Sequence, residues 1–378
     1  MLAKRLVFAL VFAVSAEAAR AATADEAAEW LKALGVPLAD AKGYVAATPE
    51  SMLEVRWVSF ARVPAGKLNP SDLAKLAALP KLHEVVFGGN AASDVGVEEL
   101  AKAVPGLRRL WLFRSPVTDA AFVHVAKFAE LEALHIAGTA VTPEAMAHVA
   151  RLRKLRTLEL DETAIGDEGL VAIKGLPALR ELSFQGMRGV GANGIAALAA
   201  MRRLEILNLG FAEIETTEPF AASRSLRELH LFRTTLDDAR AAGLGKVKTL
   251  RVLSLSYTAI TDAAMAGLAG LPQLQALHLT STRITDAGVK ALAPAKTLVE
   301  LDLTGTEMGD DSVEALLELP KLASLVLRGT KITNAGAAKL ANLKSLKHVD
   351  LAGTAVTDQA VAELAKALPD ARVVGNNQ

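Results

Sequence analysis

No cysteine occurs among the 378 residues of this chain. Without it the protein has no disulfides, no thiolate metal ligands, no cysteine nucleophile and no lipid-bearing N-terminal cysteine. An excess of charge of either sign is also absent, since 42 basic side chains balance 42 acidic ones. A chain with zero net charge has no overall attraction for nucleic acid or anionic lipid. We therefore predict no nucleic-acid partner, and nothing in the sequence indicates a cofactor.

Long apolar runs are lacking as well, except near the N-terminus. There, Lys4 and Arg5 precede a short apolar run over 6–14, and Ala-Glu-Ala at 16–18 has the form of a cleavage site. The run is too short to cross a bilayer comfortably, so we predict a signal peptide at 1–21, with an uncleaved anchor as the alternative. Once the signal is removed no membrane span remains. The mature protein is expected to be secreted or periplasmic.

What the sequence does contain is a repeat. The pattern Leu-x-x-Leu-x-Leu recurs mostly every 24 residues, with weaker copies at Val55 and Leu82. A fixed period of this size marks a solenoid, in which each repeat stacks on its neighbours. The clear copies start at Leu107, Leu131, Leu155, Leu179, Leu204, Leu226, Leu250, Leu274, Leu298, Leu322 and Leu346.

Each place in the repeat has a physical meaning. In "LQALHL", which starts at Leu274, Leu277 and Leu279 lie two apart and so point to the same side of a strand, into the core. The side chains at the third, fifth and seventh places point to the other side, which we call the open face. Thr285 and Asp286 then form a helix start, with Thr as the cap. Each repeat is therefore expected to contain a strand, a turn, a short helix and a second turn.

A polar column occupies the ninth place of most repeats, where the chain turns inward after the strand. A hydroxyl there can bond backbone groups that would otherwise be buried and unpaired, at about 1 kcal/mol each. We interpret this column as a structural turn ladder without a catalytic role. Its threonines are Thr139, Thr163, Thr234, Thr258, Thr282, Thr306, Thr330 and Thr354.

The combined pattern, LxxLxLxxTxIT/SDxGxxxL, resembles the leucine-rich repeat family, with threonine where that family usually has asparagine. It is similar to bacterial repeats of 24 residues and to the repeat arrays of F-box substrate receptors, although no F-box-like segment precedes the repeats. The resemblance implies an α/β fold: a curved, right-handed solenoid with a parallel sheet on the concave face and short helices on the convex face. It also implies protein recognition as the usual function.

The ends and the middle depart from the pattern. Residues 22–54 include a helix-forming stretch, Asp25 to Gly35, and are predicted to be a helical N-terminal cap. Residues 55–378 are predicted to form about thirteen repeats and a partial last strand. The repeats at Leu179 and Leu204 are irregular and hold both length changes. Two interpretations stay open here: tolerated drift in a surface turn, or a bend or loop that contacts a partner.

The open face carries the candidate binding residues. A tryptophan and a phenylalanine share one strand with an arginine, and tryptophan and arginine are common in binding hot spots. Alternatively, the tryptophan simply packs against Arg108 or Arg109. The predicted partner-binding residues are Arg109, Trp111, Phe113, His135, Glu159, Asp161, His230, Phe232 and His278.

Two patterns on this face resemble chemical sites but do not make them. Ser254, His278 and Asp302 occupy the fifth place of consecutive repeats in the order of a nucleophilic triad. A triad also needs an oxyanion hole and a pocket, which an open sheet does not offer, so we predict no enzymatic activity. His230 and His278 lie two strands apart, about 9.6 Å, which is far for one zinc ion. We predict no metal site.

The sequence thus predicts an exported, non-enzymatic scaffold that binds a protein through the concave open face. Two alternatives remain. One is a structural or adhesive component of the cell wall or envelope, which would self-associate or stay attached without one discrete partner. The other is a carbohydrate-binding module, which the aromatic content of 4% makes less favourable.

Overall fold

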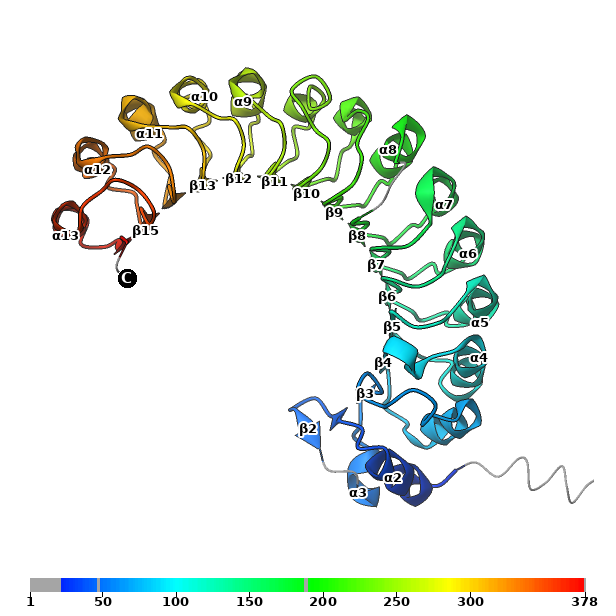
Figure 1. The fold of residues 1–378 in the computed structure, drawn as a ribbon. Coiled ribbons are helices and arrows are strands. Elements are labelled where there is room, and N and C mark those ends of the chain that lie inside the picture. The colour runs from blue at the N-terminus through cyan, green and yellow to red at the C-terminus, as the bar shows by residue number, and fades with distance from the viewer. Residues whose placement is uncertain (1–21, 46–47, 187–189, 377–378) are drawn as a thin grey trace, which may run out of the picture. The chain divides into compact units, whose positions relative to one another are not determined.

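The computed structural model describes residues 22–45, 48–186 and 190–376. The predicted signal peptide, residues 1–21, lies outside the described residues. The chain divides into two compact units, Met1–Val141 and Thr142–Gln378. From β3 onward the strands of each unit follow one another in chain order within the sheet, and a short helix or turn separates each strand from the next (Figure 1).

The first unit begins with a capping segment and continues into four parallel strands, β3 to β6. Its helices and 3-10 turns are α2 (Ala24–Ala33), α3 (Pro49–Met52), η1 (Pro70–Ala78), η2 (Gly89–Ala91), α4 (Asp94–Ala103), η3 (Asp119–Ala121) and α5 (Phe122–Val125). Its strands are β1 (Leu38–Ala39), β2 (Tyr44–Val45), β3 (Trp57–Ser59), β4 (Glu84–Gly88), β5 (Arg109–Phe113) and β6 (Ala133–His135).

The capping segment contains more than the predicted helix. Helix α2 starts with a capping box, in which Thr23 and Glu26 bond each other's backbone N–H, and Gly35 ends it with φ of +63°. After it, β1 pairs antiparallel with both β2 and β3 and so covers the edge of the first repeat strand. The prediction of a purely helical cap was therefore incomplete, because strands of two residues are too short to leave an alternating pattern.

The second unit consists of repeats throughout. Its strands are β7 (Thr157–Glu159), β8 (Glu181–Ser183), β9 (Ile206–Asn208), β10 (Glu228–His230), β11 (Val252–Ser254), β12 (Ala276–His278), β13 (Glu300–Asp302), β14 (Ser324–Val326), β15 (His348–Asp350) and β16 (Arg372–Val374). Its helices and 3-10 turns are α6 (Pro143–Val149), α7 (Gly166–Ile173), α8 (Ala192–Ala199), η4 (Glu218–Ala222), η5 (Leu244–Lys246), α9 (Asp262–Ala269), α10 (Asp286–Ala291), η6 (Asp310–Ser312), α11 (Val313–Leu317), α12 (Asn334–Leu340) and α13 (Asp358–Ala367).

Leucine columns form the core. In the second unit the strands pair in parallel with equivalent places opposite one another, as in Leu253 opposite Leu277 and Leu277 opposite Leu301. These three side chains are fully buried. Within this unit Figure 1 places the strands along the inner side of an arc and the helices along the outer side. The predicted α/β solenoid, with its parallel sheet and short helices, is confirmed.

Two columns of polar side chains stabilise the turns. In the ninth-place column each threonine hydroxyl donates to the carbonyl oxygen three residues earlier, as from Thr282 to Leu279 at 2.6 Å. The second column joins neighbouring repeats: Asp262 accepts bonds from the backbone N–H of Thr285 at 2.8 Å and from its hydroxyl at 2.6 Å. An Asp at a helix start thus also holds the cap of the next helix in place.

Candidate functional site

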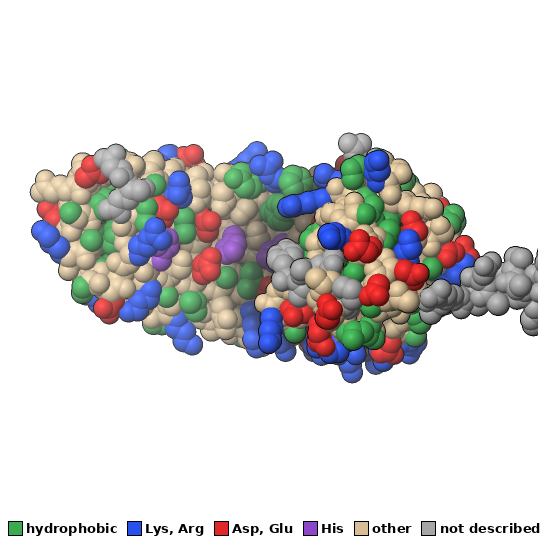
Figure 2. Space-filling view, turned by 90° about the horizontal axis from the view of Figure 1, so that it is seen from below, with side chains coloured by type: hydrophobic (Ala, Val, Ile, Leu, Met, Phe, Trp, Pro, Cys, Tyr) green, Lys and Arg blue, Asp and Glu red, His purple; other side chains and the backbone are tan. Residues whose placement is uncertain are grey.

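The open face is the first candidate site. Along the second unit the fifth-place side chains stand opposite one another in register, for instance His230 opposite Ser254 and Ser254 opposite His278. Figure 2 shows histidine side chains among acidic and basic ones on the inner face. Neighbouring strands lie about 4.8 Å apart, so these side chains form continuous columns.

In the first unit the structure brings the predicted aromatic group together. The rings of Trp111 and His135 stack with centroids 3.5 Å apart and planes 3° from parallel. Arg109 does not stack on the tryptophan but forms an ion pair with Glu84, at 3.2 Å between Nη1 and Oε2. Phe113 lies over Gly88, where an added Cβ would be 2.7 Å from the ring. Four predicted residues therefore form one surface of fixed geometry.

Trp111 is the more accessible half of this stack. His135 is buried at 9% exposure, whereas Trp111 is half-buried. The indole Nε1 has no hydrogen-bond partner among the described residues. Stacking onto the next strand therefore fixes the orientation of Trp111 without satisfying its only donor.

The predicted acidic residues of the second unit stand at its first repeat. Asp161 accepts hydrogen bonds from the Ser183 hydroxyl at 2.7 Å, and from the backbone and side-chain nitrogens of Gln185 at 2.8 and 2.9 Å. Burial raises the pKa of Asp161, and the charge of Glu159 acts in the same direction, while the bonds from Gln185 and Ser183 oppose both. This network binds two adjacent repeats together on the open face.

Farther along, His230 and Phe232 share one strand. Burial lowers the pKa of His230, and a charge on His278 would lower it further, while Glu228 acts against both. Burial therefore favours the neutral form of the His230 imidazole. The Phe232 ring lies over Gly210, where an added Cβ would be 2.4 Å from it. Glycine at the seventh place of one repeat thus receives the aromatic ring of the next, as Gly88 receives Phe113.

His278 occupies the centre of the column that resembles a triad. Its Nε2 lies 3.1 Å from Oε1 of Glu300, while Asp302 accepts a bond from the hydroxyl of Thr280 at 3.1 Å. Within the described residues no hydrogen bond joins His278 to Ser254 or Asp302. The described residues also contain no group of three side chains suited to a metal ion.

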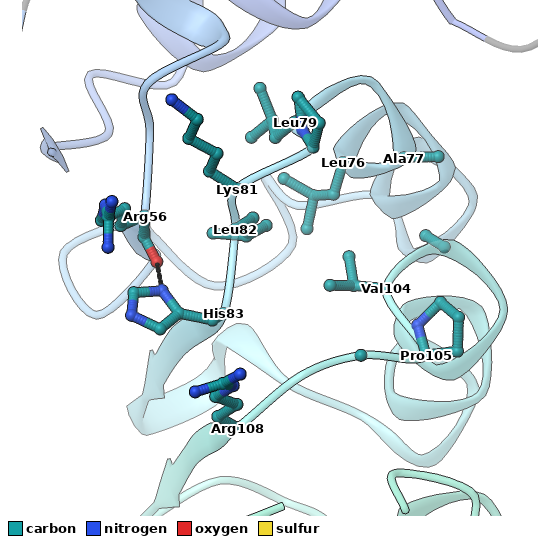
Figure 3. Close-up of a pocket in the computed structure, with 13 residues that line it drawn as sticks. Arg56, Leu76, Ala77, Leu79, Lys81, Leu82, His83, Val104, Pro105 and Arg108 are labelled. Atoms are coloured by element: carbon teal, nitrogen blue, oxygen red, sulfur yellow. Dashed lines mark hydrogen bonds between the residues drawn. The ribbon is translucent and has the colours of Figure 1, made fainter. Parts of the chain in front are cut away.

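A pocket in the first unit was not predicted. It has a volume of about 600 Å³ and lies where the chain enters successive strands (Figure 3). Its apolar wall includes Leu76 and Leu79, and its polar rim has Arg56, His83 and Arg108, all at the second place of consecutive repeats. His83 Nδ1 lies 2.7 Å from the carbonyl oxygen of Arg56. The second-place column of basic residues was the sequence signal that could have indicated this pocket.

Comparisons with known proteins agree with this architecture. Two models described as leucine-rich repeat match the chain, one at residues 224–284 and the other at 151–174 and 295–317. The chain contains leucine-rich repeats. No curated protein sequence matches it. Within the described residues, no helix is both long and apolar enough to cross a bilayer.

Solved structures show the same fold at low sequence identity. An internalin from Listeria monocytogenes is similar with a TM-score of 0.64 and 20% identity, over 94% of this chain and 95% of the internalin. A leucine-rich repeat protein from Leptospira interrogans has a TM-score of 0.51 and 18% identity, over 79% and 85% of the two chains. A plant peptide hormone receptor in complex with RGF2 has a TM-score of 0.50 and 15% identity, over 76% and 50%. The resemblance to F-box receptor arrays stays a prediction.

Proposed function

We propose that this leucine-rich repeat protein is an exported scaffold without enzymatic activity that binds a protein partner through its open face. The observation that carries the proposal is the flat stack of Trp111 on His135 within a largely polar face. Strands on a leucine core fix the positions of both rings before binding, so little ordering entropy is lost when a partner docks. Tryptophan held in this way is the type of residue that dominates binding energy at interfaces.

The charges of the face support a protein partner rather than a polyanion. Arg109 is paired with Glu84, and in the second unit Arg328 is paired with Asp350 at 3.2 Å. A face of mixed and largely paired charge selects a partner by complementarity, whereas a nucleic acid needs a continuous basic surface. The solved complex of the plant peptide hormone receptor with RGF2 offers a precedent for binding by this fold.

Substitution of Trp111 by Ala tests the proposal. We expect recovery of the partner from the envelope and secreted fractions of the native cells to fall at least about tenfold, because the substitution removes the central ring of the surface. Val171→Ala is the control, since Val171 is exposed at 40% in helix α7 and does not face the strands. N-terminal sequencing of the same protein would show whether the chain is cut after residue 21.

One outcome would contradict the proposal, and another would favour an alternative function. Equal recovery by the folded Trp111→Ala variant and by the unchanged protein would contradict binding at this surface. Recovery of nothing but further copies of the chain would favour the structural or adhesive alternative.

A further inference from the structure

The turn after most strands has a left-handed backbone at the eighth place of the repeat. In the described part of the chain every non-glycine residue with positive φ occupies this place, and glycine occupies it in most other repeats. The glycines are Gly89, Gly138, Gly186, Gly305, Gly329 and Gly353, and the exceptions are Arg114, Glu162, Phe211, Arg233, Tyr257 and Ser281. A bulky side chain in this conformation is strained, and such strain is typical of functional sites.

Four of the exceptions fall in consecutive repeats, and the first three of these, Phe211, Arg233 and Tyr257, stack on one another. The guanidinium carbon of Arg233 lies 5.6 Å from the ring centre of Phe211 and 4.6 Å from that of Tyr257. Phe211 also meets Phe232 edge to face, at 5.3 Å and 80°. This row, which we call the aromatic–arginine row, therefore continues from the open face onto the ends of β9, β10 and β11.

The row is exposed to solvent although two of its three side chains are aromatic. Phe211 is 51% and Tyr257 48% exposed, which is unusual for large hydrophobic side chains. Arg233 is exposed too, and within the described residues its guanidinium has no hydrogen bond or ion pair. Phe211 and Tyr257 come from the repeats before and after that of Arg233, so the guanidinium contacts two rings while its N–H donors have no partner among the described residues. These forked donors match the two oxygens of a carboxylate.

We propose that Phe211, Arg233 and Tyr257 form a docking site for an acidic segment of a protein, in which one Asp or Glu carboxylate pairs with Arg233 and an adjacent apolar side chain packs on the rings. The inference rests on the proposed function only in taking the partner to be a protein. It places a second contact in the second unit, on three repeats that start with the irregular one at Leu204.

The surrounding charges favour a single carboxylate over a chain of phosphates. Glu213 and Glu215 are exposed and follow Phe211 closely in the chain. One unpaired cation, with two acidic residues following Phe211 in the chain, suits one carboxylate, whereas a nucleic acid would need several cations.

Fluorine NMR gives a direct test, because the chain has only two tyrosines, Tyr44 and Tyr257. With 3-fluorotyrosine in the full chain, Tyr257→Phe assigns the two signals. We expect the capped peptide Ala-Glu-Leu-Glu-Ala to shift the Tyr257 signal saturably and leave that of Tyr44 in place. The lysine counterpart, Ala-Lys-Leu-Lys-Ala, is expected to shift neither. Arg233→Gln should reduce the shift at least about fivefold, and Ser281→Gly, in the same column, should not change it.

Three results would overturn the inference: no shift with the acidic peptide, an equal shift with the lysine peptide, or a full shift in Arg233→Gln. An equal or larger shift with inorganic phosphate would show that the site binds anions in general and not an acidic protein segment. The Trp111→Ala variant is expected to keep the shift. The peptide experiment therefore tests the docking site independently of the proposed open-face surface, which the Trp111→Ala recovery experiment tests.

Stability separates a binding role from a structural one. Arg233→Gly places glycine where other repeats already have it, so the midpoint of urea unfolding is expected to stay the same or rise while peptide binding is lost. Ser281→Gly should raise the midpoint without loss of binding. A lower midpoint for Arg233→Gly would show that the aromatic–arginine row is part of the framework, and would contradict the proposal.

Discussion

Leu277→Ala is expected to destabilise the protein by about 2–5 kcal/mol, because the substitution leaves a cavity among fully packed neighbours. Leu277 has no exposed surface and pairs in register with Leu253 and Leu301 on the two adjacent strands. Urea unfolding followed by circular dichroism measures the change. His278→Ala, one residue along, is the matched control and should cost less than about 1 kcal/mol, since its side chain belongs to the open face.

Equal losses in the two variants would contradict the alternation of core and open face. A large loss at His278 with a small one at Leu277 would mean that the strand presents the opposite side to the core, because a shift of one residue exchanges the two faces.

Gly243→Ala is expected to destabilise the protein by about 1–3 kcal/mol, by overpacking between neighbouring repeats. A Cβ at Gly243 would lie 2.4 Å from the carbonyl oxygen of Thr217 and 2.5 Å from the backbone of Glu218. Because these are backbone atoms, no change of rotamer relieves the contact. The measurement is again the midpoint of urea unfolding.

Gly267 provides the matched control, since it occupies the same place one repeat later. A Cβ there would meet nothing within 4 Å, and the residue lies inside helix α9. Gly267→Ala should therefore be neutral or stabilising by up to about 1 kcal/mol, through helix propensity. A Gly243→Ala variant as stable as Gly267→Ala would contradict the close stacking of the turns.

The leucine columns made the fold predictable from sequence. The recurrence of the pattern gives the period of the repeat, and the spacing of Leu277 and Leu279 gives the side of the strand that is buried. Equivalent places in consecutive repeats therefore had to pair in register, as they do from β7 to β12. The same register places Trp111 opposite His135, where the two rings stack.

The chemistry of the turns could be predicted only in part. Glycine recurs at 305, 329 and 353, but the sequence was not read as a left-handed eighth place, and it did not show that Phe211, Arg233 and Tyr257 adopt this conformation. Their stacking depends on the side-chain geometry of three repeats at once. The bonds that Thr285 donates to Asp262 were missed for a similar reason, because the helix start explained both residues without the neighbouring repeat.

The central claim is that leucines point inward along each strand while alternate side chains form an accessible surface. Since the native chain has no cysteine, single cysteines placed at 277, 278, 279 and 280 report on exposure one at a time. We expect His278→Cys and Thr280→Cys to react with a thiol reagent in the folded protein, and Leu277→Cys and Leu279→Cys to react only in denaturant. Protection at 278 and 280, or rapid reaction at 277 and 279, would contradict the account.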